Sequence, residues 1–122
     1  MKILSFIFFV LCVLFPTQSK ADLSDWSETD KHLLLASEIS LYLDWRQTLD
    51  IKSHSNFYET NPILGQHPSN SRVDIYFGSV MAGTYVIANQ LDENRSLFLG
   101  GITLVEVFTI LKNRRLGLSF SF

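Results

Sequence analysis

Apolar residues recur at helical spacing in three stretches of the chain, and polar segments separate these stretches. The spacing predicts helices over about 30–52, 73–91 and 96–111. Residues 53–72 carry two prolines, a glycine and three asparagines, which indicates a loop between the first two helices. The four residues that follow Leu91 are polar and just long enough to join a helical hairpin.

The first predicted helix is amphipathic and begins near Ser27, whose hydroxyl suits a helix N-terminus. Leu35, Ile39 and Tyr42 repeat at helical spacing, whereas the second half of the helix carries several charged and amide side chains. This helix is too polar to face lipid on all sides. It either crosses a membrane inside a bundle or lies at the membrane interface, and the sequence leaves both options open.

The second predicted helix is nearly uncharged and close to the length of a membrane span. Its one charged residue, Asp74, stands near its start. Small residues recur on one side of this helix, where they would let another helix approach closely. These residues are Gly78, Ser79, Ala82 and Gly83.

The third predicted helix is apolar except for Glu106. A carboxyl group inside an apolar helix is costly in lipid, so we expect Glu106 to face the bundle and find a partner there, or to stay protonated. Proton handling and a structural hydrogen bond to a neighbouring helix are both open, and we favour the structural role. After this helix the chain ends in a short irregular or strand-like tail.

The tail alternates apolar with small polar residues and ends in phenylalanine. This pattern resembles the last strand of bacterial outer-membrane barrels, which keeps association with the outer membrane as an alternative. The long apolar runs between 73 and 111 argue against a barrel for the chain as a whole.

Residues 1–21 have the pattern of an export signal: a lysine at position 2, an apolar run and a polar end with small residues. Cleavage is expected after Ala21, although an uncleaved anchor is an alternative. The only cysteine, Cys12, lies in this segment. The mature domain, 22–122, would therefore contain no disulfide and no cysteine-bound metal.

The charge pattern argues against nucleic acid as a partner. The net charge is −2, and no basic stripe with interleaved aromatic residues is present. Basic residues concentrate in the loop and the tail, which by the positive-inside rule favours three crossings with these segments in the cytoplasm. We therefore expect Sec-type export to a bacterial inner membrane, with the periplasm or outer membrane as alternatives.

Four polar residues are weak candidates for catalysis: Asp44, Glu59, His67 and Asp74. Gathered at one membrane face, they would bind a cation or supply an acid–base pair. No spacing in the chain matches a trusted metal or nucleophile motif, so no metal or other cofactor is expected. The alternative, which we favour, is that Glu59 caps backbone groups in its turn and Asp74 caps the following helix.

The segment Glu59–Gly65 predicts a structured turn, carried by Glu59, Asn61, Pro62 and Gly65. Nearby apolar residues give this loop something to pack against the bundle. We expect Ile63 and Leu64 to be buried. Glu59 is expected near the start of the next helix, where its charge would meet free N–H groups.

The motifs Asp44-Trp-Arg-Gln-Thr48, Glu59-Thr-Asn-Pro-Ile-Leu-Gly65, His67-Pro-Ser69 and Val73-Asp-Ile-Tyr-Phe77 have a family resemblance. Together they resemble small bacterial and phage-encoded membrane proteins of unknown function. The resemblance covers roughly residues 42–90. It implies a membrane topology and no particular activity.

The sequence thus predicts an all-α fold, a small membrane bundle of about three helices after a signal peptide. Its expected partners are the lipid bilayer and either itself or another membrane protein. The favoured function is a non-enzymatic envelope protein that packs against a membrane partner. A small intramembrane enzyme or an ion-handling protein is the alternative.

Overall fold

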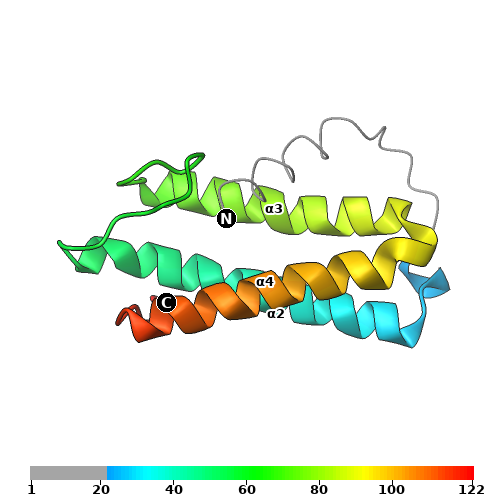
Figure 1. The fold of residues 1–122 in the computed structure, drawn as a ribbon. Coiled ribbons are helices and arrows are strands. Elements are labelled where there is room, and N and C mark those ends of the chain that lie inside the picture. Colours follow the sequence, from blue (N-terminus) through cyan, green and yellow to red (C-terminus); the bar gives the residue numbers. More distant parts are fainter. Residues whose placement is uncertain (1–21) are drawn as a thin grey trace.

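Three long helices form the molecule (Figure 1). In the computed structural model, which describes residues 22–122, they are α2 (Glu28–Asp50), α3 (Asn70–Gln90) and α4 (Arg95–Arg115). One-turn 3-10 helices flank them: η1 (Leu23–Asp25), η2 (Ile51–Ser53) and η3 (Asp92–Asn94). No strand occurs in the described part of the chain, so the expected all-α, three-helix fold is confirmed. The expected signal peptide, 1–21, lies outside the described residues.

Serine side chains set the start of two helices. The Ser27 hydroxyl accepts a hydrogen bond from the backbone N–H of Asp30 at 3.0 Å, and that of Ser69 accepts one from Arg72 at 3.2 Å. Each of them satisfies a backbone donor that the first turn of a helix leaves free. Helix α3 therefore begins three residues before Val73, and Ser69 rather than Asp74 caps it.

Helix α4 is longer than the sequence pattern indicated. It runs on to Arg115 and carries Lys112, Arg114 and Arg115 in its last turn, where positive charge interacts favourably with the helix dipole. Gly117, with φ of +99°, then reverses the chain in a conformation that suits glycine. The tail is irregular, and its Leu118 is buried.

Helices α2 and α4 run parallel, and α3 runs antiparallel beside them (Figure 1). At one end, the Ser96 hydroxyl of α4 donates to the Asp30 carboxylate of α2. At the other end, Gln47 Nε2 donates to the carbonyl of Ile110 at 3.2 Å. The tail also follows the end of α2, since the backbone N–H of Ser119 donates to Asp50 Oδ2 at 2.8 Å.

A polar cluster closes the end of the bundle that holds the α3–α4 hairpin. Trp26 is buried there, and its Nε1 donates to Asn89 Oδ1 at 3.2 Å. The guanidinium of Arg95 lies 4.3 Å from the centre of the Trp26 ring and 3.5 Å from the Asp30 carboxylate. These contacts fix where α2 begins relative to the hairpin.

Helix α2 has its polar face inside and part of its apolar face outside. Ser37, Ser40, Asp44, Gln47 and Thr48 are among its buried residues. By contrast, the expected apolar stripe is exposed: Leu35 is 58 % exposed, Ile39 51 % and Tyr42 39 %. Soluble proteins favour the opposite arrangement.

Exposed apolar side chains also cover α4 and parts of α3. Leu97, Leu104 and Phe108 of α4 are each more than 70 % exposed, and Ile75 of α3 is 70 % exposed. One described helical segment, Asp92–Arg115, is long and apolar enough to cross a membrane. Helix α3, which the sequence suggested as a span, is not such a segment.

Candidate functional site

A cavity of about 400 Å³ lies at the end of the bundle that carries the long loop and the tail. All three helices, the loop and the tail contribute to its walls. Three carboxyl groups line it, those of Asp44 from α2, Glu106 from α4 and Glu59 from the loop. Apolar and aromatic side chains complete the wall.

The carboxyl groups of Asp44 and Glu106 form a side-chain hydrogen bond with each other. Such a bond needs a proton on one of the two groups, because two ionised carboxylates offer no donor and repel. The Asp44 residue is buried. The pair therefore holds at least one proton between α2 and α4.

Asn113 extends this pair into a network. Its Nδ2 donates to Asp44 Oδ1 and to Gln47 Oε1, each at 3.2 Å. Asn113 lies beyond Leu111, the helix end expected from the sequence, and was therefore not among the expected site residues. The available signal was its spacing: Asn113 follows Glu106 by seven residues, which is close to two helical turns and therefore on the same face.

Glu59 faces the same cavity from a turn that it helps to build. Its Oε1 accepts the backbone N–H of Asn61 at 2.7 Å, and its own N–H donates to the carbonyl of Gln66 at 3.0 Å. Burial raises the pKa of Glu59 above its ordinary value of 4.5, and backbone hydrogen bonds partly oppose this shift. These hydrogen bonds of Glu59 lie within its own turn, and it is the Ser69 hydroxyl that caps the start of α3.

The rest of the turn is also held internally. Asn61 Oδ1 accepts the N–H of Ile63 at 3.0 Å, and the carbonyl of Asn61 accepts the N–H of Gly65 at 3.0 Å. Gly65 has φ of +79°, a conformation that glycine adopts without strain. Leu64 is 1 % exposed and packs against Val73 and Phe77, whereas Ile63 is half-buried and Pro62 is exposed.

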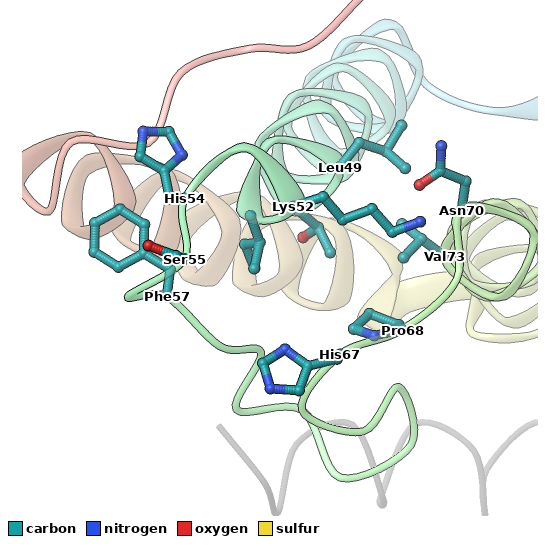
Figure 2. Close-up of a pocket in the computed structure, with 11 residues that line it drawn as sticks. Leu49, Lys52, His54, Ser55, Phe57, His67, Pro68, Asn70 and Val73 are labelled. Carbon is teal, nitrogen blue, oxygen red and sulfur yellow. The ribbon is translucent and has the colours of Figure 1, made fainter.

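The structure does not bring His67 or Asp74 to the carboxyl pair. Asp74 is exposed, and its Oδ1 accepts a hydrogen bond from Trp45 Nε1 at 2.9 Å. His67 is exposed at a second, smaller cavity of about 220 Å³. Figure 2 shows His54 and His67 at separate places along the loop around this cavity. Within residues 22–122, no group of three or more potential ligands has a metal-binding arrangement.

The small residues of α3 lie mostly at the surface of the described bundle. Gly78, Ser79 and Ala82 are exposed, and Gly83 is half-buried. A Cβ atom added at Gly78 would meet nothing within 4 Å. The close approach expected at this face is therefore not made by Gly78 within the described bundle.

No family model, curated protein or solved structure matches the chain.

Proposed function

We propose that the chain is a small integral membrane protein of the bacterial inner membrane that handles protons through the Asp44–Glu106 pair. The observation that carries this proposal is the pairing itself. Two carboxyl groups from parallel helices share a hydrogen bond inside a bundle and line a cavity. Intramembrane carboxyl groups that face a bundle interior are typical of proton-handling sites.

The distribution of side chains supports the membrane environment. Polar residues of α2 point inward, while Leu35 and Ile39 of the same helix and Leu104 and Phe108 of α4 are exposed. Exposing this much apolar surface to water would be unfavourable, whereas lipid accommodates it. The segment Asp92–Arg115 has the length and composition of a membrane span.

The pair has the chemistry of a proton carrier. With one proton present, Glu106 donates to Asp44, whose other contacts include the Asn113 amide. The proton can leave only if the remaining negative charges find compensation, because two carboxylates would otherwise repel. Glu59, which lines the same cavity, provides a further acceptor.

Infrared spectroscopy of the protein in lipid bilayers tests this proposal. At neutral pH the unmodified protein should show the carbonyl stretch of a protonated carboxyl group, and that band should shift in D₂O because the proton exchanges through the cavity. Glu106→Gln should remove the band. The matched control is Glu93→Gln, an exposed residue on η3, which should leave it unchanged. Absence of the band in the unmodified protein would contradict the proposal.

Packing against a membrane partner is the second candidate function. It is favoured by the outward face of α3, where Gly78, Ser79 and Ala82 are exposed and leave room for another helix. Gly78→Leu should leave the melting temperature of the isolated protein in detergent unchanged but reduce cross-linking to a partner or to a second copy in membranes. Unchanged cross-linking would exclude this face as the contact.

Export by a cleaved signal is part of the proposal. Cleavage after Ala21 would leave a mature chain that begins at Asp22. N-terminal sequencing of the membrane-extracted protein should return Asp-Leu-Ser, whereas Met1 at the N-terminus would show an uncleaved anchor.

A further inference from the structure

The cavity beside the carboxyl pair combines negative charge with aromatic rings. Its three carboxyl groups come from Asp44, Glu59 and Glu106. Four aromatic side chains also line it: Phe57, Tyr58, Tyr76 and Phe77. One basic residue is among the lining residues, Lys112, and it is exposed. At about 400 Å³ the cavity has the size of a site for a small organic molecule.

One acceptor in this wall lacks a donor. Glu106 Oε2 is buried and has no hydrogen-bond partner. Buried acceptors are normally satisfied, and an unsatisfied one costs about 1–3 kcal/mol. A bound donor in the cavity would supply the missing partner.

We propose that this cavity binds a small organic ammonium ion, an inference that rests on the proton-handling pair of the proposed function. The carboxyl groups would neutralise the ammonium charge, and the aromatic rings would add cation–π attraction. Leu41, Leu64 and Val80 give the remaining wall an apolar surface for the organic part of the ligand. A metal ion is less suited to this site, since the described residues offer no group of three metal ligands.

Binding is coupled to the shared proton. An ammonium ion beside Asp44 and Glu106 brings the positive charge that lets both carboxylates ionise, so the proton leaves for solvent. The other charged or titratable side chains facing the cavity are Glu59, Lys112, Tyr58 and Tyr76. Since at least one proton holds the pair together, ligand binding should release a proton from it.

Calorimetric titration of the full mature protein in detergent tests the inference with a matched pair of probes. Choline carries a quaternary ammonium group, and 3,3-dimethylbutan-1-ol is its uncharged isostere. Choline should bind and the alcohol should not. The apparent enthalpy should also change with the ionisation enthalpy of the buffer, because binding releases a proton. Equal binding of both probes, or binding of Na⁺ or Mg²⁺ in place of choline, would overturn the inference.

Variants locate the binding to this cavity. Asp44→Asn should raise the Kd for choline at least about tenfold. Glu59→Gln, a substitution on the loop, should also raise this Kd. Tyr58→Leu should raise the Kd about two- to fivefold, whereas Tyr58→Phe should not, because it keeps the aromatic face. Glu93→Gln is the control for net charge. Choline binding that all these variants leave unchanged would overturn the inference.

The two proposals fail separately. If the infrared band of a protonated carboxyl group is present and choline does not bind, the ammonium site is wrong and the proton-handling pair stands. If the band is absent, the shared proton itself is wrong, and the ammonium inference falls with it.

Discussion

Asp44 contacts polar groups on a neighbouring helix through a single carboxyl group. It accepts a hydrogen bond from Asn113 and shares one with Glu106. Replacing Asp44 with alanine leaves both partners without their acceptor inside the bundle. We expect Asp44→Ala to lower the free energy of unfolding by about 1–3 kcal/mol.

Glu106→Gln is the companion substitution at the same pair. The glutamine amide is still a donor toward Asp44, so we expect the free energy of unfolding to change by less than about 1 kcal/mol. Thermal unfolding in detergent, followed by circular dichroism, measures both variants. A larger loss of the free energy of unfolding for Glu106→Gln than for Asp44→Ala would contradict the role of the Glu106 proton as the hydrogen-bond donor between the two helices.

Glu59 gives the stability of the protein a pH dependence of known sign. Its pKa in the folded protein is raised above 4.5 by burial. The folded state therefore binds the Glu59 proton more tightly than the unfolded state does. The stability that this proton contributes is fully present below about pH 4.5, and it is lost as the pH rises through the folded pKa.

Glu59→Gln removes this dependence, because the amide does not ionise while its oxygen still accepts from the Asn61 N–H. Stability relative to the unmodified protein should therefore increase as the pH rises above 4.5. Chemical unfolding at several pH values measures the difference. A difference that stays constant with pH would show that the Glu59 carboxyl group titrates alike in both states.

At the residue scale, the sequence predicts that Glu106 needs a partner but does not identify that partner. A carboxyl group in an apolar helix has to be satisfied, and so Glu106 was expected to face the bundle. That Asp44 is its partner depends on the register of α2 against α4, which no local pattern encodes. The same dependence on helix register separates the four residues that the sequence offered as candidates for catalysis. Asp44 and Glu59 line the cavity, whereas His67 and Asp74 do not.

At the scale of elements, Asn113 joins α2 to α4. It donates to Asp44 and to Gln47, both on α2. We expect Asn113→Ala to lower the free energy of unfolding by about 1–3 kcal/mol, because two acceptors lose their donor. Asn94→Ala is a matched control, since Asn94 is exposed and its side chain makes no capping hydrogen bond. Equal effects of the two substitutions would contradict this role of Asn113.

Helix existence was predictable from periodicity, whereas the helix ends depended on individual side chains. The start of α2 was expected from Ser27, which does accept the N–H of Asp30. The start of α3 was missed by three residues, because Ser69 was counted within the loop. The end of α4 was missed because the apolar pattern stops at Leu111, and yet the basic residues that follow continue the helix.

The orientation of α2 was the part that sequence could not decide. Its periodic apolar residues predict one face, but periodicity does not say whether that face meets protein or another medium. The structure turns Leu35 and Ile39 outward and places Ser37 and Gln47 inside. An inward polar face holds the helices through side-chain hydrogen bonds, which suits helix packing where the hydrophobic effect between helices is weak.

At the scale of the whole molecule, the loop between α2 and α3 should resist proteases. Leu64 is 1 % exposed, and internal hydrogen bonds hold Glu59, Asn61 and Gly65. Limited proteolysis of the protein in bilayers, with protease on the loop side, should leave residues 56–70 intact for much longer than the tail end at Phe122. Leu64→Ser removes the apolar anchor and should make this segment sensitive. Rapid cutting of the unmodified loop would contradict the ordered turn.

The final prediction concerns how the bundle sits in the membrane. Because α2 and α4 are parallel, the loop and the tail lie at the same end, and the η3 hairpin lies at the other (Figure 1). The loop end collects six basic residues outside the tight ion pairs: Arg46, Lys52, Arg72, Lys112, Arg114 and Arg115. At the hairpin end, Arg95 is paired with Asp30, and Lys31 is paired with Glu28 at 2.8 Å. The positive-inside rule therefore predicts a cytoplasmic loop and a periplasmic hairpin.

Single cysteines report this topology, because the native chain has one cysteine, Cys12, which Cys12→Ser removes. In that background, Glu93→Cys places a thiol on the hairpin and Ser55→Cys places one on the loop, both at exposed positions. A membrane-impermeant maleimide added to spheroplasts should label Glu93→Cys and not Ser55→Cys, and inverted vesicles should give the reverse. Labelling of both thiols from one side would show that α3 and α4 do not cross. Labelling in the opposite sense would place the acidic cavity at the periplasmic face.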